Sequence, residues 1–336
     1  MQMKISEFGG EAALIDLLRT RYASRDTGAL IRGIGDDAAL IKPERDKYLV
    51  ATTDLLIEGT HFRRDIIDPY SLGWKATTVN ISDIAAMAGL PTFALVSIAL
   101  DDVPTKYFEE IYRGIVDACN RFSIKLAGGD TNSSISLIGI SVALLGEVEK
   151  DRVILRSTAK PGDAILVTGS LGESRAGMEI LMKHGLEKAK ELAPMEVERH
   201  IRPLPRVAEA RHATAAGGVT AGMDISDGLT SDLNKLCQAS NVGAIIYSER
   251  LPISPMLKKA ANILETFPAL LAEAGGEDYE LLLTVKPDAV ESVTKAIELE
   301  TATDVTVIGE ITAERDIAVV LPDGSARPPT SSWEHF

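Results

Sequence analysis

The sequence contains few cysteines and no long hydrophobic run. Cys119 and Cys237 are the only two among 336 residues, and they form no CxxC or Cys/His pattern of the kind that binds zinc. We expect both to be reduced thiols within a core. The longest nearly apolar stretch, residues 137–146, is far shorter than the ~18 residues that a membrane-spanning helix requires, and residues 1–10 lack the apolar segment of a secretion signal. These absences predict a soluble, cytoplasmic protein.

Positive charge is scarce as well. The chain has 35 Lys and Arg residues against 49 Asp and Glu residues, which gives a formal net charge of -14. Such a surface repels the phosphates of nucleic acids and of anionic membranes, so we expect neither as a partner. The acidic excess has two interpretations, namely a solvated surface that keeps the protein soluble or carboxylates that hold metal ions. The positions of the acidic residues must decide between them.

Length and composition favour two α/β domains. The chain is about twice as long as a typical domain, and its hydrophobic residues make up 45%, enough for two buried cores. A polar stretch places the boundary near Lys150, which gives an N-terminal domain of residues 1–150 and a C-terminal domain of residues 151–336. Periodicity predicts helices at residues 11–19, 70–87, 106–121, 174–184, 205–215, 228–239 and 288–297. It predicts strands at residues 47–53, 93–100, 136–147, 164–168, 221–225, 243–247, 279–284, 304–311 and 317–321.

Two common phosphate-binding loops are excluded. Residues 33–38, GIGDDA, superficially resemble the GxGxxG loop that binds dinucleotides, but the adjacent Asp36 and Asp37 would repel a pyrophosphate unless a metal ion lay between them. Pro43 also interrupts any long helix after this segment. No GxxxxGK[ST] sequence occurs, which excludes an ordinary P-loop. Any phosphate chemistry must therefore rest on other residues.

Acidic residues recur beside small or hydroxyl-bearing residues near the ends of predicted elements. This pattern suits Mg2+, which prefers oxygen ligands and is commonly shared between carboxylates and substrate phosphates. The competing interpretation is helix capping, which applies to Asp224, Ser226 or Asp227 taken singly. Asp83 is harder to explain in this way, because a charge in an otherwise apolar helix is costly to bury. The acidic residues concerned are Asp36, Asp37, Asp54, Asp83, Asp130, Asp224 and Asp227.

Four further residues have chemical potential but also ordinary explanations. His61 lies in a glycine-containing loop and, as a lone histidine, could simply cap it. Arg156 fits an ordinary surface charge, and Glu277, at the start of a predicted strand, fits protection of a sheet edge. Trp333 fits packing, unless the tail of the chain folds over a ligand. Both interpretations stay open for each of the four.

Taken together, the motifs resemble those of the thiamine-monophosphate kinases. They run in order along nearly the whole chain: GIGDDAA, TTD with GTHF, NISDIAAMAG, LAGGDT, RSTAKPGD, MDISDGL, GGEDYELL and a final WEHF. GIGDD and DISDGL are shared with the wider superfamily of aminoimidazole-ribonucleotide synthetase and selenophosphate synthetase, whereas GTHF and WEHF are more specific. The resemblance implies transfer of the ATP γ-phosphoryl group to thiamine monophosphate, with several Mg2+ ions and no covalent phosphoenzyme. It also implies two mixed α/β domains and a homodimer in which the N-terminal sheets pair into a barrel-like arrangement.

The resemblance further implies roles for individual residues. Positions near the thiamine phosphate are His61, Glu277 and Trp333. Nucleotide contacts match Tyr112, Gly129, Asp130, Arg156 and Ser226, of which Tyr112 is placed by spacing alone. Metal-binding positions match Asp36, Asp37, Thr52, Thr53, Asp54, Asp83, Asp130, Asp224 and Asp227.

The predicted mechanism uses no protein nucleophile. The attacking group is a phosphate oxygen of the substrate, whose second pKa of about 6 leaves it mostly ionised at neutral pH. Catalysis then consists of in-line positioning and charge neutralisation, with Asp54, Asp83 and Asp130 as the main catalytic residues. Two alternatives stay open, namely an ATP-dependent cyclase of the aminoimidazole-ribonucleotide type and a nucleotide sensor or scaffold that has lost its chemistry.

Overall fold

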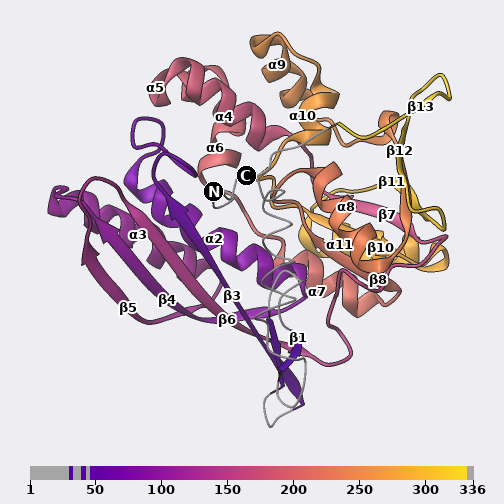
Figure 1. Ribbon diagram of the computed structural model, residues 1–336, viewed down its shortest axis with the longest axis horizontal. Coiled ribbons are helices and arrows are strands. Elements are labelled where there is room, and N and C mark those ends of the chain that lie inside the picture. The colour runs from indigo at the N-terminus through magenta and orange to yellow at the C-terminus, as the bar shows by residue number, and fades with distance from the viewer. Residues whose placement is uncertain (1–29, 33–38, 43–45, 331–336) are drawn as a thin grey trace, which may run out of the picture.

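The computed structural model describes residues 30–32, 39–42 and 46–330 of the chain. Figure 1 shows two α/β lobes, each built around its own sheet, with the earlier residues in one lobe and the later residues in the other. The predicted helix at residues 11–19 lies outside the described residues, and so do Asp36, Asp37 and Trp333.

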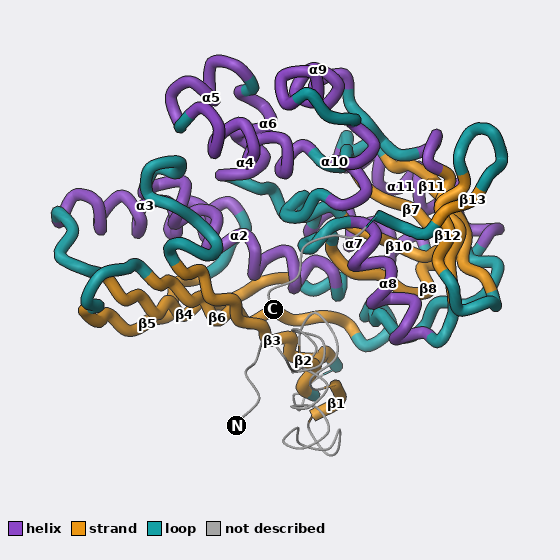
Figure 2. Tube along the Cα trace, turned by 45° about the horizontal axis from the view of Figure 1, so that its top comes forward, coloured by secondary structure: helices purple, strands orange, loops and turns teal. Residues whose placement is uncertain are grey.

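The first lobe contains a sheet that is covered by helices on one face. Its elements are β1 (Leu30–Arg32), β2 (Ala39–Ile41), β3 (Lys47–Ile57), α2 (Pro69–Ala86), β4 (Leu90–Leu100), α3 (Thr105–Arg121), β5 (Lys125–Ser133) and β6 (Gly139–Glu149). The strand order is β1-β2-β3-β6-β4-β5, in which β4 and β5 are parallel and the other neighbours antiparallel. Figure 2 shows α2 and α3 on one side of this sheet, whereas no described helix lies on the other side. We call this second side the open face.

The open face exposes large hydrophobic side chains. Because side chains alternate along a strand, Leu55 on β3 points away from the helices, and Phe93 and Leu95 on β4 do the same. Each of the three is more than two-fifths exposed. A contiguous apolar surface of this kind commonly marks an interaction site.

The second lobe is a mixed sheet surrounded by helices. Its strands are ordered β13-β12-β9-β11-β7-β10-β8, and only β9 and β12 run parallel. Strand β10 is therefore internal. The elements are β7 (Ala164–Thr168), α4 (Glu173–His184), α5 (Leu186–Leu192), α6 (Pro194–Ile201), α7 (Val207–Ala216), β8 (Val219–Asp224), α8 (Leu229–Ser240), β9 (Gly243–Tyr247), α9 (Pro255–Leu264), α10 (Pro268–Ala274), β10 (Leu281–Val285), α11 (Val290–Thr301), β11 (Val305–Thr312), β12 (Ile317–Val320) and β13 (Ala326–Arg327).

Helix α2 connects the two lobes. It begins where the Asp68 carboxylate accepts a hydrogen bond from the Ser71 N–H (2.9 Å), with Pro69 at the first helical position. The helix packs on β3, β6 and α3 of its own lobe and also contacts α6, α7 and β8 of the other. Almost all of its residues are buried, and two of its polar side chains, Lys75 and Ser82, bond to residues of the second lobe. A peripheral ion pair adds to this contact, because Arg211 on α7 donates to both carboxylate oxygens of Glu149 (2.6 and 3.0 Å).

Most predicted elements are confirmed to within a few residues, with two corrections that concern the site. The strand predicted to end at residue 53 continues to Ile57, so Thr52 and Asp54 lie inside β3 and not at its end. The Gly128-Gly129-Asp130 segment, for which no element was predicted, lies within strand β5. Periodicity missed β5 because this edge strand is exposed along its whole length and carries no apolar alternation. The domain boundary near Lys150 stays a prediction.

Several short helices of the second lobe were also missed, namely α5, α6, α9 and α10. Each spans ten residues or fewer, which is too short for a helical period to stand out from its surroundings. Within the described ranges, no helix combines the length and the apolarity that crossing a bilayer would need. The expected cytoplasmic location stays a prediction.

Candidate active site

A cavity of about 390 Å3 lies where the two lobes meet. The first lobe contributes walls from β3, the loop after it and α2, and the second lobe contributes α4, α6 and the loops that follow β8 and precede β10. The fold thus brings together side chains that are far apart in the sequence. The predicted site residues that line the cavity are Asp54, His61, Asp83, Asp224, Ser226, Asp227 and Glu277.

Hydroxyl groups hold two of the carboxylates in this cavity. Thr52 Oγ1 on β3 donates to the Asp83 carboxylate on α2 at 2.6 Å. Ser82 Oγ, the neighbour of Asp83 on α2, donates to the Asp224 carboxylate at the end of β8 at 2.5 Å. The second bond joins the lobes inside the protein, because both of its partners are buried. The orientation of these acids is therefore fixed before any ligand binds.

Asp54 is a predicted site acid whose ionised form is disfavoured. Its backbone N–H donates to Asn80 Oδ1 on α2 (2.8 Å), which ties β3 to the helix beside the cavity. Burial raises the pKa of Asp54 to about 6, and the nearby negative charge of Asp227 contributes in the same direction. A cation in the cavity would offset this repulsion.

The loop between β8 and α8 is held by an acid that the sequence reasoning did not single out. The Asp232 carboxylate accepts hydrogen bonds from the backbone N–H groups of Ser226 and Asp227, both at 2.9 Å. Lys235 pairs with Asp227 and with Asp232. The N-cap residue of α8 is Gly228, and no side chain caps this position. The capping interpretation of Asp224, Ser226 and Asp227 is therefore wrong.

The segment before β10 forms the opposite part of the wall with a strained backbone. Glu277 and Tyr279 both have positive φ angles, 63° and 51°, which residues other than glycine rarely adopt. Their backbone N–H groups donate to the carbonyls of Ser226 (2.7 Å) and Ile225 (2.9 Å), so this segment and the loop after β8 support each other. Edge protection does not explain Glu277, because β10 is an internal strand.

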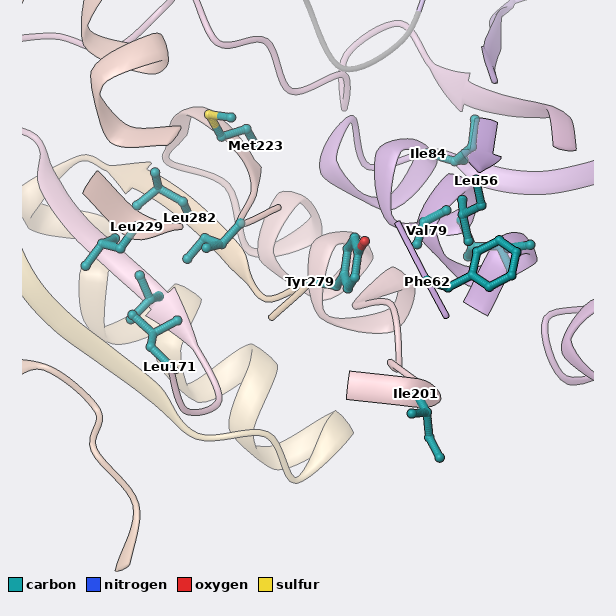
Figure 3. Packing of buried hydrophobic residues seen from close by; sticks show 14 of the residues in the cluster. Leu56, Phe62, Val79, Ile84, Leu171, Ile201, Met223, Leu229, Tyr279 and Leu282 are labelled. Atoms are coloured by element: carbon teal, nitrogen blue, oxygen red, sulfur yellow. The ribbon is translucent and has the colours of Figure 1, made fainter. Parts of the chain in front are cut away.

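Tyr279 belongs to a hydrophobic cluster that spans both lobes. Figure 3 shows its ring between Val79 of the first lobe and Leu282 of the second. Burial raises the pKa of Tyr279 well above its ordinary value, and the negative charge of Glu277 adds to this. The phenol therefore stays protonated and is a hydrogen-bond donor at the cavity wall.

His61 combines both of its predicted interpretations. Its Nδ1 accepts a hydrogen bond from the Ile57 N–H (3.0 Å), which closes the turn after β3. The neutral ring consequently carries its proton on Nε2. Because the residue also lines the cavity, capping the loop and facing a ligand are compatible.

The remaining described candidates do not line this cavity. Asp130 on β5 pairs in register with Ser97 of β4, whose side chain is on the open face, and so Asp130 and Thr53 lie on that face. The register also places Gly129 three strands from Asp54, a distance of roughly 14 Å at the usual strand spacing. Tyr112 packs against Phe108 on α3, with ring centroids 4.8 Å apart.

Arg156 lies in the connection between the two lobes. Its backbone carbonyl accepts a hydrogen bond from Ser240 Oγ (2.6 Å), and its side chain is partly buried. This partial exposure is compatible with an ordinary surface charge. Its predicted role as a nucleotide contact stays a prediction.

The sequence reasoning missed four ionisable residues of the cavity. These are Lys75 on α2, Arg175 on α4, His200 on α6 and Tyr279. Lys75 could have been found by the argument used for Asp83, since it is a charge in a helix that is otherwise mostly uncharged. The other three carry no comparable signal, because nothing in the local sequence indicates which neighbours they meet.

The carboxylates of the cavity fit hard cations such as Mg2+. Within the part of the chain that the structure describes, no three His, Cys, Asp or Glu side chains converge closely enough to enclose a metal ion by themselves. This agrees with the chemistry of Mg2+, which keeps several waters and takes further oxygens from phosphates. The raised pKa of Asp54 is the observation that favours a cation here.

Comparison with known proteins identifies the family. The family model for the AIR synthase related protein N-terminal domain matches residues 35–148, and the model for its C-terminal domain matches residues 160–322. The thiamine-monophosphate kinase of Aquifex aeolicus is 39% identical over 99% of this chain and 100% of its own length. This chain belongs to the thiamine-monophosphate kinase family. It is accordingly a kinase.

Two further relatives agree with this membership. The thiamine-monophosphate kinase of Bacillus subtilis is 36% identical over 77% of this chain and 79% of its own length. The solved structure of AaThiL complexed with AMPPCP and TMP superposes with a TM-score of 0.87 at 37% identity and covers 100% of both chains. The two-domain α/β fold that the sequence predicted is thus confirmed.

Proposed function

We propose that this kinase transfers the γ-phosphoryl group of ATP to thiamine monophosphate and so forms thiamine diphosphate and ADP. The observation that supports this most is the cavity between the lobes, which places four carboxylates together with His61 and Glu277. A relative that matches the whole chain has been solved with AMPPCP, an ATP analogue, and TMP. The cavity thus offers acids for metal-bound phosphates and separate polar groups for the acceptor.

The roles divide between the two lobes. Asp54 and Asp83 on the first lobe and Asp224 and Asp227 on the second would hold Mg2+ ions through their carboxylate oxygens. When bound, these ions would offset the repulsion between the phosphates of the donor and the acceptor. Further proposed ligands are Asp36, Asp37, Thr52, Thr53 and Asp130, and the proposed nucleotide contacts are Tyr112, Gly129, Asp130, Arg156 and Ser226.

The protein's own contribution to the reaction is positioning. A phosphate monoester is already largely ionised at neutral pH, so its oxygen can attack the γ-phosphorus in line without a general base. Asp83 and Asp224 are held by hydroxyl groups, and the segment with Glu277 is held by the loop that carries Ser226. These supports keep the two binding regions at a fixed separation, which is the geometric requirement for in-line transfer.

We also propose that the enzyme is a homodimer whose open faces pack together. The exposed Leu55, Phe93 and Leu95 provide the apolar surface for this contact. Because Thr53 and Asp130 lie on the same face, they would become enclosed by the dimer and not by the cavity of one chain. Light scattering of the active preparation should give twice the chain mass, and a monomeric active species would contradict the proposed contact.

The experiment that tests the activity follows both products. Purified protein is incubated with ATP, Mg2+ and thiamine monophosphate, and ADP and thiamine diphosphate are quantified by chromatography. Equal amounts of both, lost when Mg2+ is omitted, are expected. ADP without thiamine diphosphate would show another acceptor, and a cyclised product from a different substrate would favour the cyclase.

A further inference from the structure

Lys75 is a buried cation, and each N–H donor of its ammonium group has a partner. Its Nζ lies 3.0 and 3.1 Å from the two carboxylate oxygens of Glu277 and 3.5 Å from His200 Nε2. An ammonium group has three N–H donors and no acceptor, so these three contacts account for all of them. The Lys75 side chain is 2% exposed, whereas that of Glu277 is 31% exposed. Although both residues line the cavity, Glu277 is thus far more accessible to a ligand than Lys75.

The contact with Lys75 also sets the state of His200. Because Nε2 faces an ammonium group, it must accept, and the ring proton is on Nδ1. Nδ1 lies 3.2 Å from a Glu277 carboxylate oxygen and 3.2 Å from Ser174 Oγ. Burial lowers the pKa of His200 to about 3, and the charge of Lys75 acts in the same direction. The ring is therefore neutral, with Nδ1 hydrogen-bonded to Ser174 Oγ and lying beside the Glu277 carboxylate.

Glu277 is consequently held as an anion in one orientation. Burial is the largest influence and would raise the pKa of Glu277, but the charge of Lys75, its hydrogen bond to the carboxylate and the nearby His200 and His61 together lower that pKa. The backbone is fixed as well, since the Glu277 N–H donates to the Ser226 carbonyl (2.7 Å) and the residue has a φ of 63°. Such a conformation persists only where the surroundings enforce it.

We propose that Lys75 and His200 are positioning residues that present Glu277 as a fixed carboxylate to the positively charged, amino-bearing ring system of the acceptor. This inference deepens the proposed function and rests on it. A thiazolium ring is a permanent cation and an aminopyrimidine carries N–H donors, so both complement a carboxylate in the cavity wall. Lys75 itself does not bind phosphate, because its donors are occupied.

The test is a double-mutant cycle on Lys75→Met and Glu277→Gln. Lys75→Met is expected to raise KM and Kd for thiamine monophosphate by roughly 10- to 100-fold, the usual effect of losing a charge-assisted contact. KM for ATP should change by less than about threefold, well below that range. If Lys75 acts only through Glu277, the double variant should be no weaker than Glu277→Gln alone. Kd is measured by calorimetry with the inert ATP analogue, so it does not depend on turnover.

A matched control separates positioning from mere attachment of the lobes. Arg211→Met also removes an ion pair between the lobes, but at their periphery, and should lower stability without changing KM for thiamine monophosphate. His200→Gln keeps a hydrogen-bond donor and an acceptor, so it should raise KM for thiamine monophosphate by less than Lys75→Met does. If Lys75→Met fails to fold, this second variant tests the positioning role.

Two kinds of failure are distinguishable. An unmodified enzyme that forms no thiamine diphosphate would overturn the proposed function. Three outcomes would overturn the positioning role alone. The first is an unchanged Kd for thiamine monophosphate in both Lys75→Met and His200→Gln. The others are effects that add in the double variant, and an equal rise in KM for both substrates.

Discussion

Replacing Asp54 by asparagine is expected to make the ligand-free protein more stable while making the enzyme less active. The Asp54 carboxylate is buried beside the negative charge of Asp227, and both facts disfavour its ionised form. Asparagine has the same shape and no charge, so it removes this penalty. It also removes a ligand that we assign to Mg2+, which should depress turnover steeply and increase the Mg2+ requirement.

The size of the effect follows from the pKa. The rise from 3.8 to about 6 corresponds to an upper limit of ~3 kcal/mol, so a gain of about 1 to 3 kcal/mol is expected for Asp54→Asn. Since the folded protein holds a proton that the unfolded chain releases between those two values, stability falls as pH rises through this range. The penalty is fully present above about pH 6. The difference between the variant and the unmodified protein should therefore shrink as pH falls towards 4.

Urea unfolding in a metal chelator at about pH 8 and about pH 4 measures this difference. The matched control is Asp323→Asn, because that carboxylate accepts hydrogen bonds from the Ser325 N–H (2.9 Å) and Oγ (2.6 Å) in an exposed turn. The control should be unchanged or slightly less stable at both values. An Asp54→Asn protein that is no more stable than the unmodified one at the higher pH would refute the reasoning.

Two buried or partly buried ion pairs give further expectations. Arg206→Met should lower the free energy of unfolding by about 3 to 5 kcal/mol, because it leaves the Glu280 carboxylate without its bidentate partner. The Glu280 side chain is only 3% exposed, so water cannot replace that partner. A loss below ~1 kcal/mol in urea unfolding would contradict this expectation. The hydrogen bonds from Arg211 lower the pKa of Glu149 from 4.5 to about 2, so this pair stabilises the protein above pH 4.5 and loses its effect as pH falls to 2. Because Glu149 is about one-third exposed, Glu149→Gln should cost only on the order of 1 kcal/mol near neutral pH, and a cost that persists at about pH 2 would refute the assignment.

Local sequence patterns predicted those features of the site that depend on a single element. A carboxylate within an apolar helix must have a partner, and Asp83 does contact Thr52 and line the cavity. The end of β8 at Asp224 and the start of α8 at Leu229 were also predictable, because a short apolar strand gives way there to a glycine and a helical period. In each case the local sequence contains the physical reason.

Features that depend on packing between distant segments were not predictable in this way. Lys75 and Glu277 are 202 residues apart, and neither local sequence indicates that their side chains meet. The role of Asp232 was missed although it is local, because no sequence pattern indicates that its side chain reaches back from the first turn of α8 to the loop after β8. Asp130 has the right chemistry for the acidic cluster, but the strand register places it on the open face.

Some polar contacts between the lobes lie at their periphery, such as the Arg211–Glu149 pair, whereas others lie at the cavity. The contacts at the cavity determine how the site forms. The Ser82–Asp224 contact holds a carboxylate that lines the cavity, and the Lys75–Glu277 contact joins two residues that line it. Docking of the lobes and alignment of the binding groups are therefore one event. The first lobe by itself contributes Asp54 and Asp83. Among the described residues, no third acidic side chain lies close enough to these two to enclose a metal ion with them. Mg2+ and both phosphate-bearing substrates should therefore bind only to the docked arrangement. By linkage, they should also stabilise the contact between the lobes that creates their site.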